Sequence, residues 1–304
     1  MTNRFKTAFI ALCLCACATT VDADPGFNQW RQEFAPRAKL AGISQKTIDK
    51  TLPKLSFVPR VIELDRQQPE FKLSLEEYQS RVLTPARIAQ GAQLWSANQK
   101  LFQRLEKEYG VEPQILLALW AIETRYGEVK GGFDALSALA TLAYEGRRAA
   151  YFEKELIASL KLIDSGKIRA KDMRASWAGA MGQTQFMPTT LQRYGVDGNG
   201  DGKIDVWNNK TDALTSGANY LKGAGWKHGQ GWGQEISPND PRLAQYSNDP
   251  NFLKIEGNTP HYFLLAPNYQ VFLNWNRSHL FAITVGQLAD AIKAKKSTSG
   301  RTSS

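Results

Sequence analysis

The chain has 304 residues, which fits one large domain or two smaller ones, and a hydrophobic share of 42% supports a sizeable core. No run of 18 apolar residues occurs, which excludes an ordinary membrane-spanning helix. The formal net charge of +9 favours an anionic partner such as a cell-wall polymer, a membrane surface or a nucleic acid, and the alternative is a solubility charge without a partner.

Residues 1–23 have the pattern of an export signal peptide. Arg4 and Lys6 precede a short apolar segment at 8–18, and Val21-Asp22-Ala23 fits a small-x-small cleavage site. We therefore expect an exported, periplasmic protein that is soluble after cleavage between Ala23 and Asp24.

The cysteines add a second interpretation of the same segment. Cys13, Cys15 and Cys17 all lie within it, so a chain cleaved after Ala23 has no disulfide and no cysteine-based chemistry. The alternative is a bacterial lipobox at 14–17, which would leave a lipid on Cys17 and associate the protein with the outer membrane.

Residues 24–294 are predicted to form one mainly helical domain with irregular loops and a small β-containing insertion. Helices are expected within 27–50, 74–109 with a break at Thr84-Pro85, 113–127, 134–165 as a pair, 212–222 and 284–294. The connecting segments are an irregular stretch at 53–75, a turn-like one at 176–188, a Gly/Asp loop at 197–206, short strands within 235–272, and a basic, disordered tail at 295–304.

The strongest helix carries a carboxylate at the end of an apolar run. Pro113 suits a first helical turn, and Gly127 is a natural stop. Leu116, Leu119 and Glu123 fall on one face. Apolar surroundings and the negative end of the helix dipole both raise a carboxyl pKa, so Glu123 is a candidate general acid for glycosidic-bond cleavage. The alternative is a structural Glu that hydrogen-bonds a nearby backbone turn.

The segment 176–188, SWAGAMGQTQFMP, combines small residues with two amides. Its glycines allow the backbone to approach a ligand closely. Gln183 and Gln185 lie among apolar residues, a setting that suits sugar hydroxyls and N-acetyl groups. A tight turn between helices explains the glycines equally well.

Several separated motifs, in the same order, resemble the lytic murein transglycosylase B family. They are WAIETRYG (120–127), SWAGAMGQTQFMP (176–188), DGNGDGKIDVW (197–207) and ANYL (218–221), supported by DRQQPEF (65–71), YQSRVLTPARIAQG (78–91), YEGRRAAYFEKEL (144–156) and NWNRS (274–278). The resemblance covers most of the chain after residue 23. It implies a catalytic domain like goose-type lysozyme.

The family resemblance implies a reaction on peptidoglycan. Its members cleave the bond between N-acetylmuramic acid and N-acetylglucosamine without water and leave a 1,6-anhydromuramic acid end. One carboxyl group suffices, because the attacking group is the C6 hydroxyl of the substrate. Glu128 and Asp134, the nearest other acids in sequence, lie in the glycine-rich stretch after the helix, so the motif offers no obvious second carboxylate.

The resemblance also implies roles for individual residues. Glu123 matches the family's catalytic acid/base. The residues matching its glycan groove are Tyr78, Ser176, Gln185, Phe186, Tyr220 and Asn276. Trp275 stands where relatives carry Tyr, which keeps an aromatic face but removes a hydroxyl. Arg147 and Arg148 are candidates for contact with stem-peptide carboxylates, and a solvated helix start is the alternative.

The loop 197–208 matches an EF-hand-like Ca²⁺ loop. Asp197, Asn199, Asp201, Lys203 through its carbonyl, and Asp205 fall at ligand positions 1, 3, 5, 7 and 9. Position 12 is Asn208 in place of the bidentate Glu, and the resemblance suggests Asp212 as the closing ligand. A structural Ca²⁺ is therefore expected, with a metal-free turn as the alternative and no organic cofactor.

Two other functions compete with the transglycosylase. A lysozyme-type hydrolase of the same glycan would need a held water, and a scaffold protein would bind peptidoglycan strands without cutting them. Nucleic-acid binding is disfavoured by the export signal. The protein is expected to be a monomer, with other cell-wall enzymes as candidate partners.

Overall fold

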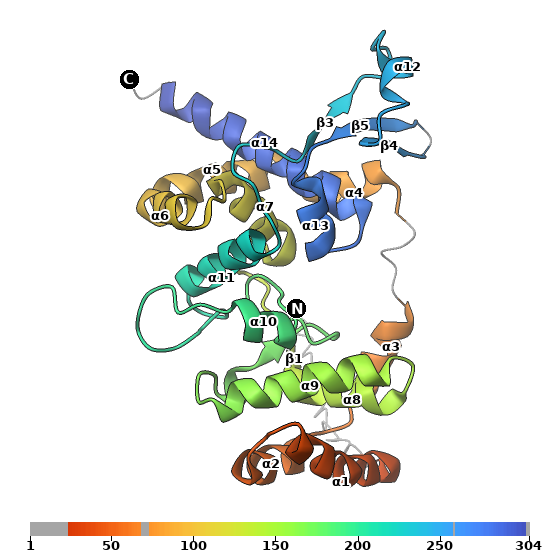
Figure 1. The fold of residues 1–304 in the computed structure, drawn as a ribbon, viewed down its shortest axis with the longest axis vertical. Coiled ribbons are helices and arrows are strands. Elements are labelled where there is room, and N and C mark those ends of the chain that lie inside the picture. Colours follow the sequence, from red (N-terminus) through yellow and green to blue (C-terminus); the bar gives the residue numbers. More distant parts are fainter. Residues whose placement is uncertain (1–23, 68–72, 258, 302–304) are drawn as a thin grey trace, which may run out of the picture.

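A computed structural model describes residues 24–67, 73–257 and 259–301 (Figure 1). The predicted signal peptide lies outside these residues. In the described part of the chain, no helix is long and apolar enough to cross a membrane.

The chain is mainly helical, as predicted. The α-helices are α1 Pro25–Leu40, α2 Gln45–Thr51, α3 Pro59–Gln67, α4 Leu75–Val82, α5 Pro85–Ala97, α6 Gln99–Tyr109, α7 Pro113–Thr124, α8 Ala135–Glu145, α9 Ala149–Asp164, α10 Pro188–Tyr194, α11 Lys210–Gly223, α12 Leu243–Tyr246, α13 Tyr269–Trp275 and α14 His279–Arg301. Short 3₁₀ helices are η1 Leu52–Lys54 and η3 Ala170–Asp172, and the strands are β1 Phe133–Asp134, β2 Arg174–Ala175, β3 Gly233–Ile236, β4 Phe252–Ile255 and β5 His261–Leu265.

The helices form two groups, each around its own apolar core. The lower group in Figure 1 packs α8 against α9, with α1, α2 and α10 around them. The upper group packs α14 against α5 and α7. Tyr220 and Trp275 pack against both cores, so they mark the boundary where the groups meet.

The strands form two small antiparallel sheets. The larger has the order β3-β5-β4, as the short strands expected within 235–272 suggest, and it lies beside α14 at the top of Figure 1. The smaller pairs Phe133 with Ala175 and Asp134 with Arg174. This ribbon fixes the position of Ser176, the next residue along the chain.

Two regions differ from the sequence prediction. The stretch expected to be irregular contains α3, which buries Val61 and Asp65 against the lower group. The tail predicted to be disordered from Lys295 instead continues α14 to Arg301, and the Lys296 ammonium donates to the Ser96 hydroxyl at 2.8 Å. Composition alone misjudged this tail because α14, which is buried between Phe281 and Ile292, continues its helix into it.

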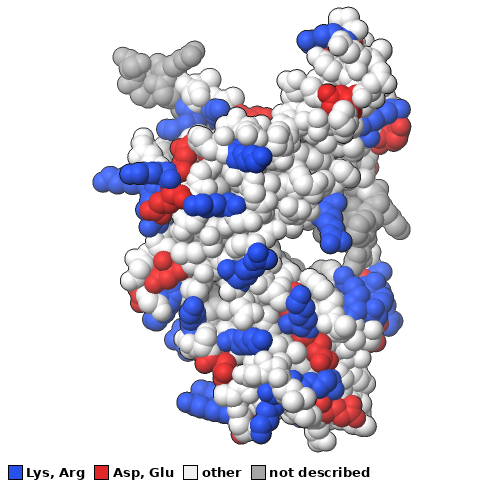
Figure 2. Space-filling model, viewed as in Figure 1, with Lys and Arg blue, Asp and Glu red and all other residues white. Residues whose placement is uncertain are grey.

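Basic side chains are abundant on the lower group. Figure 2 shows Lys and Arg spread over this half of the visible face, around α1, α2, α8 and α9. On the visible face, basic side chains interspersed with acidic ones therefore cover the region beneath the boundary between the two groups.

Candidate active site

Helix α7 places Glu123 in its last turn, next to an unusual helix end. Seven consecutive residues from Ile115 to Ala121 are buried, which anchors the helix in the upper core. After Thr124 the backbone turns left-handed at Arg125 (φ 51°) and Tyr126 (φ 59°), two positions where side chains are costly. Such conformations persist where surrounding contacts fix them, and they are common at functional sites.

The contacts that fix this turn come from the segment 181–187. The Trp120 indole donates to the Gln183 side-chain oxygen at 3.0 Å, and the Thr124 hydroxyl donates to the Gln183 carbonyl at 2.7 Å. Gly127 packs so closely that a Cβ there would lie 2.4 Å from Gln183 Oε1. These contacts hold the end of α7, and Glu123 with it, in one place.

The carboxylate of Glu123 accepts a hydrogen bond from Trp275. The distance from Trp275 Nε1 to Glu123 Oε1 is 2.8 Å, and Glu123 is half-buried. An indole N–H can only donate, so Oε1 acts as an acceptor and a proton is favoured on the other oxygen. Trp275 lacks the hydroxyl of the Tyr expected at this position, but its indole N–H supplies a hydrogen-bond donor to Glu123.

Three aromatic rings form a wall beside Glu123. The Trp275 ring centroid lies 5.2 Å from that of Phe186 and 5.0 Å from that of Tyr220. The Tyr220 hydroxyl donates to the Asn274 carbonyl at 2.7 Å, which ties α11 to the end of α13. The structure therefore brings Phe186 and Tyr220, two of the predicted groove residues, to the Glu123 site through Trp275.

Ser176 and Gln185 belong to the same folded segment as Phe186. Ser176 closes a tight turn, since its hydroxyl accepts from the Ala180 N–H at 3.1 Å. Met181 bridges both Ala175 and Phe186, and Gln185 has a left-handed backbone (φ 49°) with its amide donating to the Gly182 carbonyl. The turn predicted at 176–188 is confirmed, and it forms one edge of the site.

Asn276 and Tyr78 occupy more peripheral places. Asn276 directly follows Trp275, and its side chain accepts from the Ser278 N–H at 3.0 Å, just before α14 begins. Tyr78 packs against the upper core from α4. Gln183, in contrast, is 4% exposed, and its amide makes hydrogen bonds within the protein that hold α7.

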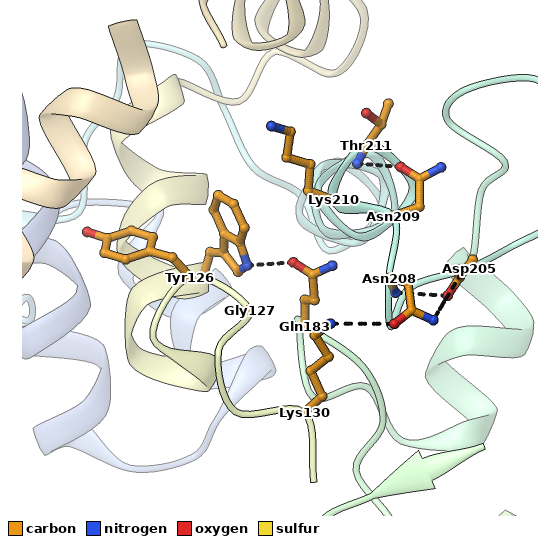
Figure 3. Close-up of a pocket in the computed structure, with 10 residues that line it drawn as sticks. Tyr126, Gly127, Lys130, Gln183, Asp205, Asn208, Asn209, Lys210 and Thr211 are labelled. Atoms are coloured by element: carbon orange, nitrogen blue, oxygen red, sulfur yellow. Dashed lines mark hydrogen bonds between the residues drawn. The ribbon is translucent and has the colours of Figure 1, made fainter. Parts of the chain in front are cut away.

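A polar cleft of about 630 Å³ opens behind the end of α7 (Figure 3). Gln183 lies in the middle of it, with Tyr126 and Gly127 on one side and Asn208 on the other. The Lys130 ammonium reaches Asn208 Oδ1 at 3.5 Å. The cleft thus connects the turn after Glu123 with the end of the loop 197–208.

The other charged residues weighed from sequence are engaged elsewhere. Asp134 caps α8 by accepting from the Ser137 N–H at 2.8 Å, and the exposed Glu128 accepts from Gln90. Arg147 and Arg148 both pair with the buried Asp65 carboxylate. Burial opposes ionisation of Asp65, but the two guanidinium groups outweigh it and hold its pKa below the usual range.

The predicted Ca²⁺ loop folds as a turn held by its own hydrogen bonds, since Asp197 accepts from the Gly200 and Gly202 N–H groups. No three acidic, His or Cys side chains are grouped to hold a metal ion anywhere in the described residues. Asn208, at position 12, points its amide N–H groups toward Asp205, at 3.3 and 3.4 Å from its oxygens. An amide donor therefore stands at position 12, where a calcium loop places its bidentate carboxylate.

Asp212, the predicted closing ligand, accepts hydrogen bonds from the backbone of the loop. Its side chain is 0% exposed, and its two oxygens accept from the Gly198 N–H at 3.0 Å and the Asp205 N–H at 2.8 Å. Burial raises its pKa, whereas these backbone donors oppose the rise. Asp212 thus closes the loop by hydrogen bonds from the protein backbone.

Comparison with known proteins agrees with this architecture. The model of the transglycosylase SLT domain matches residues 26–290. The chain belongs to this family. It is 31% identical over 240 residues to the membrane-bound lytic murein transglycosylase B of Escherichia coli, covering 71% of this chain and 66% of that relative, slightly less than two thirds of its length.

Two solved structures show the fold shared by the family. SltB3 of Pseudomonas aeruginosa, in complex with NAG-NAM-pentapeptide, matches with a TM-score of 0.81 at 35% identity and covers 88% of this chain and 79% of that one. Slt35 of Escherichia coli, in complex with calcium, matches with a TM-score of 0.74 at 28% identity, covering 90% and 94%. The mainly helical, lysozyme-like fold predicted from sequence is confirmed.

Sequence patterns did not reveal every residue that builds this site. The bond between Trp275 and Glu123 joins residues 152 positions apart, so no local pattern encodes it. Gln183 was noted for its amide, but only the fold shows that both ends of that amide are used inside the protein, by Trp120 and by the Trp207 carbonyl. In this family member, the positioning of the carboxylate is a tertiary feature.

Proposed function

We propose that this SLT-domain protein is a peptidoglycan lytic transglycosylase with Glu123 as its catalytic acid and base. The observation that carries the proposal is a single half-buried carboxylate, held by an indole donor between two packed helical groups. The predicted reaction cleaves the β-1,4 bond between N-acetylmuramic acid and N-acetylglucosamine.

The proposed chemistry needs one carboxyl group that works twice. Protonated Glu123 donates its proton to the glycosidic oxygen while the bond from that oxygen to the muramic C1 breaks. The carboxylate then accepts the proton of the C6 hydroxyl as O6 bonds to C1. The products are a new N-acetylglucosamine hydroxyl and a 1,6-anhydromuramic end, and Glu123 regains its proton without added water.

Trp275 would act as a positioning residue in both steps. Because its N–H donates to Oε1, protonation is favoured on the other oxygen, which is then the one that meets the substrate. The same hydrogen bond stabilises the carboxylate formed after proton donation, since donors favour the charged form. The indole therefore orients the acid and supports its conjugate base.

We infer that the glycan lies along the aromatic wall. Ser176, Gln185 and Phe186 contribute one edge and Tyr220 another, with Asn276 and Tyr78 farther out. Aromatic faces suit the apolar faces of sugar rings, and amide and hydroxyl groups suit their hydroxyls and N-acetyl groups. Support also comes from the SltB3 relative, whose structure contains NAG-NAM-pentapeptide.

We further propose that the protein acts outside the cytoplasm. Residues 1–23 have the pattern of an export signal, and the E. coli relative is described as membrane-bound. The domain then consists of residues 24–294 and their helical extension to Arg301. Cleavage after Ala23 would give a soluble protein, whereas lipidation of Cys17 would give an anchored one. Metabolic labelling with palmitate distinguishes the two forms.

Digestion of purified sacculi tests the proposed reaction. Mass spectrometry should find anhydro-muropeptides, which are lighter by one water than hydrolytic products. Reducing-end muropeptides would instead indicate a lysozyme-type hydrolase. Sacculi that bind the protein but release no fragment would indicate a scaffold protein.

A further inference from the structure

A second pocket lies in the lower helical group, away from the Glu123 site. It has a volume of about 770 Å³, a size typical of sites for small ligands. Its walls come from the end of α2 with η1, the start of α8, and the end of α9 with η3. Segments more than 100 residues apart in the sequence therefore build it, and we call it the basic pocket.

The basic pocket combines an apolar floor with a cationic rim. The apolar side chains are Leu55, Val58, Leu136, Ile163 and Ile168. The cationic side chains are Lys50, Lys54, Arg169 and Lys171. The only acid among the lining residues that the structure describes is Asp134, whose Oδ1 accepts the Ser137 N–H as the cap of α8.

Three of the four cations have no ion-pair partner within the described chain. Arg169 pairs with Asp172, whereas Lys50, Lys54 and Lys171 make no ion pair to any residue that the structure describes. This differs from Arg147 and Arg148, which share the buried Asp65 carboxylate. The positive charges of these three lysines are therefore available to pair with a carboxylate of a ligand.

Hydroxyl groups lie between the floor and the rim. Thr51, Ser56 and Ser137 line the pocket, and Ser137 Oγ accepts from the Ser56 N–H at 3.2 Å. Peptide amides need such partners when they leave water, whereas a lipid chain does not. The mixture of small apolar surfaces, hydroxyls and lysines therefore matches an acidic peptide better than an acyl chain.

We propose that the basic pocket binds a short acidic peptide with small apolar side chains, the chemistry of the stem peptide on muramic acid. This assignment rests on the proposed function for its choice of peptide. The β1–β2 ribbon connects the pocket along the chain to Ser176, one of the predicted groove residues. Asp134 lines the pocket and pairs with Arg174, and Ser176 follows two residues later.

Calorimetry with a sugar-free stem peptide tests the proposal directly. The probe is L-Ala-γ-D-Glu-meso-diaminopimelate-D-Ala, and the purified protein is compared with Lys54→Glu/Lys171→Glu. Two charge reversals at the rim should weaken binding about tenfold or more, and high salt should weaken it in the wild type. Lys100→Glu/Lys107→Glu on α6 makes the same charge change elsewhere and should bind within about twofold of wild type.

Several outcomes would overturn the assignment. They are no binding of the peptide, equal binding by both double variants, or binding to phosphatidylglycerol vesicles in place of the peptide. A circular dichroism melt of the rim variant establishes that it is folded. If the rim variant unfolds, Lys171→Gln, which removes one charge at an exposed position, repeats the comparison.

Glycan cleavage separates this proposal from the proposed function. Amidase-treated strands without peptides should be cut equally by wild type and the rim variant, while the advantage of peptide-bearing strands should shrink in the variant. A wild type that cuts neither substrate refutes the proposed function, yet the calorimetry still decides whether the basic pocket binds the peptide.

Discussion

The Glu123 site and the loop 197–208 are both rich in polar groups, but they are assembled in opposite ways. Glu123 receives its hydrogen bond from Trp275, a residue on another helix. In the loop, the Asp197 carboxylate accepts hydrogen bonds from the backbone N–H groups of Gly200, Asp201 and Gly202. One region therefore presents a carboxylate held by distant parts of the fold, and the other uses its carboxylates to shape itself.

This difference distinguishes a carboxylate that is held in position for chemistry from carboxylates that stabilise a loop. A side chain held from outside its own segment keeps a fixed direction while its remaining surface stays available, which catalysis needs. A carboxylate whose oxygens accept several backbone N–H groups stabilises a turn instead. Activity should therefore depend on the first region and folding stability on the second.

The largest expected effect is on activity, from Glu123→Gln. The amide cannot donate an acidic proton or accept one back, so the rate of fragment release from sacculi should fall about 10²–10⁴-fold. The melting temperature should stay close to that of wild type. A variant that keeps more than about a tenth of the wild-type rate would remove Glu123 from the acid/base role.

The next effect is on stability, from Asp212→Ala. This change removes the buried acceptor of the Gly198 and Asp205 N–H groups, and we expect a loss of about 2–4 kcal/mol in the free energy of unfolding. The exposed Asp201→Ala in the same loop is the matched control and should cost less than about 1 kcal/mol. Equal losses in urea denaturation would mean that the loop is braced by something other than Asp212.

A smaller effect on activity is expected from Trp275→Phe. The ring keeps most of the aromatic wall but loses the N–H that orients Glu123, so the rate should fall about tenfold, the scale of one hydrogen bond to a charged group. The alkaline limb of the pH–rate profile, where the general acid loses its proton, should move to higher pH, because the carboxylate loses a donor that favours its charged form. An unchanged profile with a slower rate would reduce Trp275 to a packing role.

Removal of calcium should have almost no effect. Because Asp212 and backbone N–H groups close the loop, EGTA and added Ca²⁺ should give melting temperatures within about 2 °C of each other. A clear rise on addition of Ca²⁺ would mean that the loop rearranges to bind the ion, as expected from its sequence.

A further small effect is a pH dependence at His261 on β5, which links α4 to the larger sheet. Its Nε2 lies 3.0 Å from Glu76 and its Nδ1 2.7 Å from Glu235. Burial disfavours the charged ring, but hydrogen bonds with Glu235 and Glu76 outweigh it and raise the pKa of His261. The stabilisation is therefore full below the unfolded pKa of about 6.5 and is lost as pH rises through the higher folded pKa.

Melting curves at two pH values measure this dependence. Relative to His261→Gln, the wild type should be about 1–3 °C more stable at pH 5.5, and most of that difference should vanish at pH 9. A difference that grows as the pH rises would contradict the sign derived from the raised pKa.

Sequence patterns predicted what depends on neighbours along the chain. The run from Ile115 to Ala121 predicted a buried helix, and its periodicity placed Glu123 on the face with Leu116 and Leu119. The small residues of 176–188 predicted a turn, although they did not show that Gln183 faces inward.

The remainder depends on packing between distant segments. The match of 197–208 to a calcium loop predicted ligands, but burial of Asp212 beneath the loop turns its oxygens to the backbone. The basic pocket is likewise invisible in sequence, since Lys54 and Lys171 are brought together by the lower group. The tail after Lys295 is helical because it continues the buried part of α14.

Catalysis by Glu123 is tested most directly by mass spectrometry of the fragments that the wild type and Glu123→Gln release from purified sacculi. The account predicts anhydro-muropeptides from the wild type and almost none from the variant. Reducing-end products from the wild type, or equal release by both proteins, would contradict it.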